Sequence, residues 1–186
     1  GRDTPGPRRA ALVAGPRVPR AQEEVTRAAR AWSTAEVLVG AAAVADRVSA
    51  VAQGADVLHV AAHGRHSADN PLFSGLELVD GPWFGYDIEQ LASVPSTVVL
   101  SACELGRSAV RWGAETLGMT VAWQHAGARC VIASPSRVDD DVACEVLGRT
   151  HEHLAAGRTP AHALLEARRA ADAPGPVPFS CYGAGW

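Results

Sequence analysis

The feature that most constrains the fold is an alternation of short apolar segments with amphipathic stretches in the first third of the chain. The apolar runs 10–14, 36–39 and 57–62 have the length and composition of buried strands. Between them, the stretches 22–31 and 43–53 place apolar residues at helical spacing. An order of strand, helix, strand, helix and strand predicts a parallel sheet covered by helices, which is an α/β fold.

The rest of the chain keeps to short elements of both kinds. The segment 76–84 predicts a small β-hairpin, because Asp80-Gly81 is a turn signal between two apolar arms. Pro82 restricts the second arm to the edge of its sheet. Further strands are expected at 97–100, 130–133 and 179–183, and further helices at 86–91, 112–125, 139–155 and 159–172.

Length and composition favour a single domain. A chain of 186 residues is long enough for one well-buried α/β domain, which we place at 10–186. The preceding residues 1–9 are rich in Pro, Gly and Arg and indicate a linker. Because the chain begins with Gly rather than Met, we expect it to be a domain of a longer protein, with regulatory domains in the same chain.

The net charge and the cysteines indicate which classes of partner and which cellular location to expect. A net charge of −3 indicates neither a nucleic-acid nor a membrane partner. No stretch is long and apolar enough to predict a membrane span, and no secretory signal is visible. The four cysteines, at positions 103, 130, 144 and 181, are scattered without metal-ligand spacing, which fits reduced thiols and a cytoplasmic location.

Two of the predicted strands end in residues that carry chemistry. The apolar run 57–62 is followed by His63, and the run 97–100 is followed three residues later by Cys103. In an α/β sheet, chemistry takes place outside the carboxyl ends of the parallel strands, and neighbouring strands lie about 4.8 Å apart. If these strands are neighbours, an imidazole base meets a thiol nucleophile. The alternative is a buried apolar cysteine and a hydrogen-bonded core histidine.

The same residues carry a resemblance to a known family. The blocks that carry it are His59-Val-Ala-Ala-His63-Gly64, Pro71-Leu-Phe-Ser74-Gly-Leu-Glu-Leu78, Leu100-Ser-Ala-Cys103-Glu-Leu-Gly106, Gly127-Ala-Arg129, Val131-Ile-Ala-Ser134 and Val138-Asp-Asp140. In these blocks the chain resembles the CHAT domain of the caspase-like cysteine peptidases, a group that includes separase, legumain and gingipains. The resemblance extends from about residue 11 to residue 185 and implies a three-layer α/β/α caspase-like sandwich, with a mainly parallel sheet of about six strands.

The chemistry expected at these residues is peptide-bond hydrolysis without a cofactor. Cys103 would attack a peptide carbonyl as a thiolate, and His63 would protonate the leaving amine and then activate water. The backbone N–H groups of Gly64 and Cys103 are the candidates for the oxyanion hole, since glycine lets the carbonyl approach closely. The resemblance implies the same dyad and the same two amides.

Two further histidines lie near His63. His59 lies four residues earlier on the same face of the strand and is expected to be a structural hydrogen-bonding residue. His66 lies in the following loop and is expected to be solvated. A zinc site formed by these three histidines is an alternative, but their spacing straddles a strand end, and no cysteine lies nearby in sequence. We therefore predict no metal.

The resemblance also implies which residues bind the substrate. The residue two before the nucleophile, Ser101, is expected to line the floor of the first specificity pocket. Asp139, in the region after the fifth strand, is a candidate to pair with an Arg or Lys of the substrate. The alternative is that Asp139 only caps the following helix. The chain departs from the family at Ser136, where the family usually carries Trp, which bears on substrate preference and on activity.

Three functions follow from these observations. The first is a cysteine endopeptidase that cleaves protein or peptide substrates, as a module of a larger regulated protein. The second is a catalytically inactive relative that binds a peptide or a partner through the same cleft. The third is a different α/β enzyme with a reactive thiol, such as an acyl transferase or amidase. In the first case Cys103 should be the reactive thiol, while Cys130, Cys144 and Cys181 are expected to be shielded and protonated.

Overall fold

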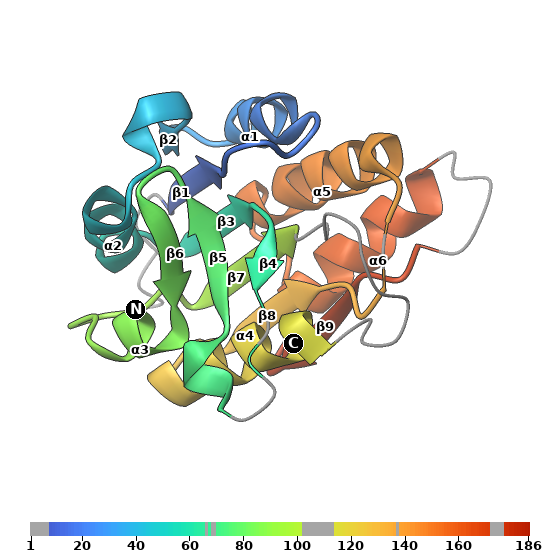
Figure 1. Ribbon diagram of the computed structural model, residues 1–186. Helices are drawn as coiled ribbons and strands as arrows, with labels where there is room; N and C mark the ends of the chain where they lie inside the picture. The colour runs from blue at the N-terminus through green and yellow to red at the C-terminus, as the bar shows by residue number, and fades with distance from the viewer. Residues whose placement is uncertain (1–7, 66, 68–69, 102–113, 137, 172–176) are drawn as a thin grey trace, which may run out of the picture.

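The structure, a computed structural model, describes residues 8–65, 67, 70–101, 114–136, 138–171 and 177–186. Its centre is a six-stranded sheet with the strand order β2-β1-β3-β7-β8-β9 (Figure 1). The strands are β1 (Arg9–Ala14), β2 (Thr34–Leu38), β3 (Val57–Ala61), β7 (Thr97–Ser101), β8 (Cys130–Ala133) and β9 (Ser180–Gly183). All neighbouring pairs are parallel except β8 and β9, which are antiparallel.

The composition of each strand fits its place in the sheet. β1, β3, β7 and β8 lie inside the sheet, are rich in Val, Leu, Ile and Ala, and are buried along nearly their whole length. Continuous apolar runs of this kind are typical of strands that are covered on both faces. β2 lies at one edge, and its first three residues, Thr34-Ala35-Glu36, are exposed.

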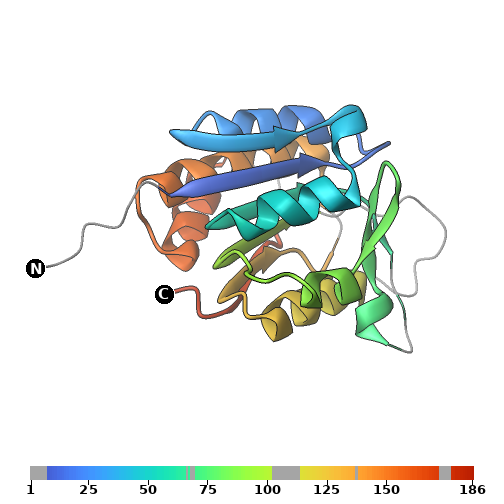
Figure 2. The same cartoon turned by 90° about the vertical axis from the view of Figure 1, so that its left-hand side faces the viewer.

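Among the described residues, six α-helices cover the two faces of the sheet (Figure 2). The helices α1 (Ala21–Ala29), α5 (Asp140–Ala155) and α6 (Pro160–Ala170) pack on one face, and α2 (Ala45–Gln53), α3 (Gly85–Glu89) and α4 (Ala114–Ala126) pack on the other. Side chains of β3 alternate between the layers, since Leu58 and Val60 join the core under α2–α4, while Val57 and Ala61 join the core under α1. The chain is therefore a three-layer α/β/α sandwich, as predicted.

A second, three-stranded sheet lies at the carboxyl ends of the parallel strands (Figure 2). It consists of β4 (Gly64–Arg65), β5 (Gly75–Leu78) and β6 (Gly81–Phe84), all antiparallel. The predicted hairpin is β5 and β6, but its pairing with the residues after His63 is not visible in the sequence pattern. Trp83 of β6 is fully buried and packs edge-on against Trp123 of α4, which anchors the small sheet on the core.

The predicted elements are confirmed, with end points that differ by a few residues. Two short 3₁₀ turns, η1 (Gly40–Ala42) and η2 (Pro71–Phe73), were not predicted from the sequence. Of the expected linker 1–9, residues 1–7 are not among the described residues, and Arg9 already begins β1. In the described part of the chain, no helix combines the length and the apolar character that crossing a membrane requires.

Candidate active site

The carboxyl ends of β3 and β7 lie side by side. The sequence analysis required this adjacency for the dyad but could not establish it. The two strands are parallel neighbours, with Ala61 opposite Ser101, and the N–H of Ala62 donates to the Ser101 carbonyl at 3.1 Å. His63 follows Ala61 by two residues, and Cys103 follows Ser101 by two residues. Cys103 itself belongs to the stretch 102–113, which lies outside the described residues.

The ring of His63 is held in one orientation. The side chain is buried, and its Nε2 atom donates to the backbone oxygen of Arg17 at 3.0 Å. A carbonyl oxygen only accepts hydrogen bonds, so Nε2 carries the hydrogen, and the lone pair of the neutral ring is then on Nδ1. The carbonyl of His63 also accepts from the N–H of Glu77 at 2.8 Å. Both the backbone and the imidazole are therefore fixed, with Nδ1 as the basic nitrogen.

The turn after β1 supplies the carbonyl that orients His63. Gly15 donates its N–H to the Ala61 carbonyl at 2.8 Å, which continues the pairing of β1 with β3. A Cβ atom at Gly15 would lie 2.7 Å from both the Cβ of Ala62 and the backbone oxygen of Glu77. Only glycine fits this close approach of three segments. Arg17, two residues on, has a φ of 58°, a left-handed conformation that is uncommon for arginine.

Gly64, the candidate oxyanion-hole residue, is the first residue of β4 and lies opposite Leu76 of β5. It is partly exposed, so its backbone can be reached from solvent. The second candidate donor, the N–H of Cys103, falls outside the described residues. The oxyanion hole therefore stays a prediction.

A buried carboxylate, which the sequence analysis missed, joins the two strands. Glu24 of α1 is only 5% exposed. Its Oε1 atom accepts from Nε2 of His59 at 2.8 Å, and its Oε2 atom accepts from the Ser101 hydroxyl at 3.2 Å. The signal was present in the sequence, because Glu24 shares the buried face of α1 with Ala21, Val25 and Ala28, where an apolar residue is expected.

The hydrogen bonds of His59 continue into α5. Its Nδ1 atom accepts from Nε2 of His151 at 3.0 Å, and Nδ1 of His151 accepts from the indole N–H of Trp32 at 3.0 Å. Burial, together with the neighbouring His59, lowers the pKa of His151 well below its ordinary value of 6.5. His59 is thus a structural hydrogen-bonding residue, as expected from the sequence.

The two residues predicted to bind substrate have partners within the fold. Ser101 is buried, and its hydroxyl donates to Glu24. Asp139 is exposed and caps α5, because its Oδ1 atom accepts from the N–H groups of Asp141 at 2.9 Å and Val142 at 3.4 Å. The capping role is therefore present, and a role in substrate binding stays a prediction. Ser136, where the family usually has Trp, is exposed, and its N–H donates to Ser134 Oγ at 3.2 Å.

The expectation of shielded thiols is confirmed for two cysteines and wrong for the third. Cys130 and Cys144 are buried. The pKa of Cys130 is raised by its hydrogen bond to Cys181 and by burial, and the pKa of Cys144 is raised by burial. Cys181 is partly exposed, and the hydrogen bond from Cys130 lowers its pKa. The two thiols come together because β9 runs antiparallel to β8, with Cys181 opposite Ile132.

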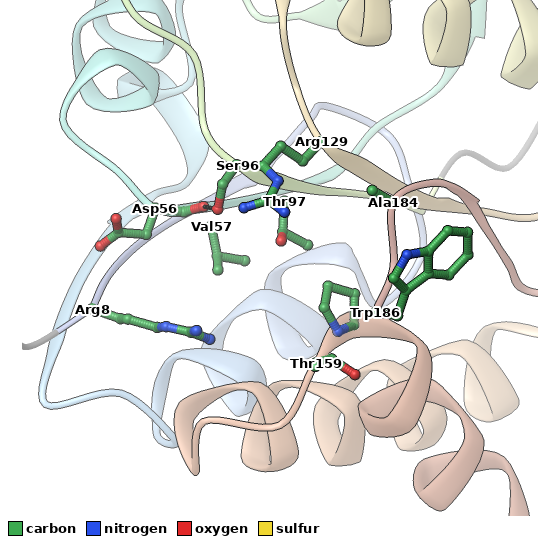
Figure 3. A pocket seen from close by; sticks show the side chains of 10 residues that line it. Arg8, Asp56, Val57, Ser96, Thr97, Arg129, Thr159, Ala184 and Trp186 are labelled. Atoms are coloured by element: carbon green, nitrogen blue, oxygen red, sulfur yellow. Dashed lines mark hydrogen bonds between the residues drawn. The ribbon is translucent and has the colours of Figure 1, made fainter. Parts of the chain in front are cut away.

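The described residues form no metal site, and a pocket among them lies away from the ends of β3 and β7 that precede His63 and Cys103. No three His, Cys, Asp or Glu side chains among the described residues come together as a metal site, and His66 is not among these residues. Figure 3 shows a pocket at the opposite end of the sheet, lined by Val57 and Thr97, the first residues of β3 and β7. The predicted chemistry lies at the other ends of these strands.

The fold and the paired strand ends define a caspase-like α/β protein. Its structure is similar to that of gingipain R, described as an Arg-specific cysteine proteinase, with a TM-score of 0.58 and 13% sequence identity. The similarity covers 87% of this chain and 41% of gingipain R, so the chain spans about two-fifths of that protein. A pyridoxal kinase from Staphylococcus aureus overlaps with 88% of the chain and 86% of its own, at 11% identity and a TM-score of only 0.41.

The sequence itself assigns the family. The model of the CHAT domain matches residues 5–176, which is nearly the whole chain. The chain therefore belongs to the CHAT domain family, as the resemblance of its motifs implied. No sequence among the curated proteins matches it.

Proposed function

We propose that the protein is a cysteine endopeptidase with His63 and Cys103 as its catalytic dyad. The observation that carries the proposal is the register of β3 and β7, in which Ala61 lies opposite Ser101. His63 and Cys103 each follow this pair by two residues in the sequence. Parallel neighbours that end in step bring the residues beyond them to the same edge of the sheet. Membership in the CHAT family and the gingipain-like fold support the same chemistry.

The orientation of His63 suits the role of a base. With Nε2 donating to the Arg17 carbonyl, Nδ1 is the nitrogen that exchanges a proton with the thiol. Cys103 then attacks the peptide carbonyl, the C–N bond breaks, and the imidazolium gives its proton to the leaving amine. Water, deprotonated by the same nitrogen, hydrolyses the thioester. The N–H groups of Gly64 and Cys103 stabilise the oxyanion in both steps.

The proposed substrate is a protein or peptide with a basic residue before the cleaved bond. Ser101 lines the floor of the pocket for this residue, and the Asp139 carboxylate pairs with its charge. Asp139 is exposed, as this role requires, although it also caps α5. Gingipain R, which has a similar fold, is described as Arg-specific. In a longer protein, regulatory domains would control access to this cleft.

The test is cleavage of a peptide library by the wild-type protein and by the variants Cys103→Ala and His63→Ala. We expect both substitutions to abolish cleavage while circular dichroism and thermal unfolding show a folded protein. A peptide ketone electrophile should label Cys103, and a simple thiol reagent provides the comparison that separates a peptidase from other thiol enzymes. Cleavage that survives Cys103→Ala would reject this nucleophile. A wild-type protein that binds peptides without cleaving them would be an inactive relative.

A further inference from the structure

The carboxylate of Glu24 is the one group among the described side chains that accepts hydrogen bonds from both β3 and β7. Its two oxygens are used separately, with His59 of β3 on Oε1 and Ser101 of β7 on Oε2. Glu24 belongs to α1, which packs on the face of the sheet that carries Val57 and Ala61 of β3. The carboxylate therefore links three elements at a point four residues before His63 and two residues before Cys103 in sequence.

A carboxylate at this position is costly unless every oxygen is satisfied. A leucine or methionine would fill the buried face of α1 without the cost of removing a charge from water. In some proteins, buried polar or ionic groups fix one arrangement of the elements that they join. The position of Glu24 between two strand ends suggests that this arrangement is the one required by the adjacent site.

The direction of the hydrogen bonds is fixed from the far end of the network. The indole of Trp32 can only donate, so Nδ1 of His151 must accept, and Nε2 of His151 must donate to Nδ1 of His59. Nε2 of His59 then carries the remaining hydrogen and donates to Glu24. Each ring therefore has a single tautomer, and every bond of the chain points toward the carboxylate, where the bonds strengthen one another.

We propose that Glu24 is a positioning residue, whose carboxylate holds the carboxyl ends of β3 and β7 in the register that the dyad needs. The proposal rests on the proposed function for its catalytic part, because His63 and Cys103 continue from these two strand ends. A shift of about 1 Å in the position of reacting groups can cost on the order of 10²-fold in rate. We call the two hydrogen bonds that Glu24 accepts from His59 and Ser101 the clamp. Loss of the clamp should therefore lower kcat much more than it changes KM.

The test compares variants that remove the clamp with one that removes the far end of the network. Glu24→Met removes both acceptors, and Ser101→Ala removes only the bond to β7, with less risk to folding. Trp32→Phe is the matched control, because it deletes a buried hydrogen bond of the same network but leaves the Glu24 carboxylate in place. Glu24→Gln is the conservative variant, since its amide oxygen can accept from His59 while its NH₂ group donates to the Ser101 hydroxyl.

We expect Glu24→Met to lower kcat by about tenfold or more with KM nearly unchanged. Ser101→Ala should also lower kcat, and only its kcat is compared, because Ser101 also lines the proposed substrate pocket. Trp32→Phe should lower stability while its kcat stays within about threefold of the wild type. Glu24→Gln should recover most of the kcat that Glu24→Met loses. Equal kcat in Glu24→Met and Trp32→Phe, or a kcat of Glu24→Gln as low as that of Glu24→Met, would overturn the positioning role.

A second measurement does not depend on activity. The N–H of Ala62 donates to the Ser101 carbonyl across the two strand ends, so its hydrogen exchange reports on their pairing. Exchange at Ala62 should accelerate by about tenfold or more in Glu24→Met relative to Trp32→Phe, after correction for global stability. If the wild-type protein cleaves nothing, the proposed function fails. Hydrogen exchange at Ala62 alone then tests whether Glu24 holds the two strand ends together. Unchanged protection of Ala62 in Glu24→Met then rejects it.

Discussion

The imidazoles of His59 and His151 lie nearly parallel, with their ring centroids 5.0 Å apart and their planes inclined by 10°. Nε2 of His151 donates to Nδ1 of His59 at 3.0 Å, so the bond requires one hydrogen between the two rings. Protonation of His151 would add a hydrogen to its Nδ1 atom, which accepts from the indole N–H of Trp32, and would break that bond. The pair therefore depends on a neutral His151, which its buried position enforces.

The first prediction is a loss of stability in mild acid. The pKa of His151 is well below 6.5 in the folded protein and near 6.5 in the unfolded chain. Below pH 6.5, the unfolded chain binds a proton that the folded protein excludes, so the free energy of unfolding falls as the pH falls. Well above pH 6.5 this contribution is constant. Urea unfolding should therefore show a smaller free energy of unfolding at pH 5.5 than at pH 7.5 because of this residue.

The control for this prediction is His151→Gln. The amide oxygen of glutamine can accept from Trp32 and its NH₂ group can donate to His59, but the side chain does not titrate. The variant should therefore lose less stability than the wild-type protein over the same pH range. Apart from His59, which is bonded to residue 151, the other histidines keep their surroundings in both proteins, so their contributions cancel in the difference. Identical pH dependence would show that His151 is not the responsible group.

The second prediction concerns the close approach at Gly15. In Gly15→Ala, the new Cβ would meet the Cβ of Ala62 and the carbonyl of Glu77 at 2.7 Å, and the backbone must move. We expect a loss of about 1–3 kcal/mol in the free energy of unfolding, measured by urea denaturation. Because Ala62 precedes His63, cleavage should also slow. Gly54→Ala is the matched control, since its nearest contact would be at 3.8 Å, and it should stay within about 0.5 kcal/mol of the wild type.

The fold and the position of His63 could be predicted because they depend on local pattern. Continuous apolar runs identify strands that are covered on both faces, and the alternation of strands with helices limits the sheet to a parallel arrangement. The end of the run 57–62 then fixes where His63 lies relative to the sheet. The proposed dyad also requires β3 and β7 to be neighbours in the sheet, and they are.

Features that depend on long-range pairing could not be predicted in this way. The carbonyl of Arg17 orients His63, but a backbone oxygen leaves no trace in the sequence. Glu24 was visible as an acid on an apolar helix face, yet its partners on β3 and β7 become known only when α1 is packed on the sheet. The contact between Cys130 and Cys181 likewise depends on the antiparallel register of β9, which composition does not reveal.

The third prediction concerns the proposed specificity. Asp139→Ser should keep α5 capped, because serine is also a favoured N-cap residue, but it removes the carboxylate. We expect the wild-type protein to prefer Arg or Lys before the cleaved bond and the variant to lose about tenfold or more of this preference in kcat/KM. Peptides with norleucine at this position measure the remaining activity. A wild-type preference for acidic or purely apolar residues would reject the role of Asp139.

The last prediction concerns the reactivity of the thiols, and it separates an assembled dyad from a binding module before any substrate is known. A neighbouring imidazolium favours the thiolate, so the pKa of Cys103 should lie below the free value of about 8.5. Cys130 and Cys144 are buried with raised pKa values and should react slowly. Cys181 is partly exposed with a lowered pKa and would compete, so the measurement is made in a Cys181→Ser background.

In that background, a limiting amount of iodoacetamide at about pH 6 should modify Cys103 first, as mapped by peptide mass spectrometry. His63→Ala should slow this modification, because the thiolate loses the cation that stabilises it. Trp32→Phe should leave the order of labelling unchanged, since it acts at the far end of the Glu24 network. If the three remaining cysteines react alike, or if Cys103 is the slowest, then His63 does not activate the thiol. The chain would then be an inactive member of its family.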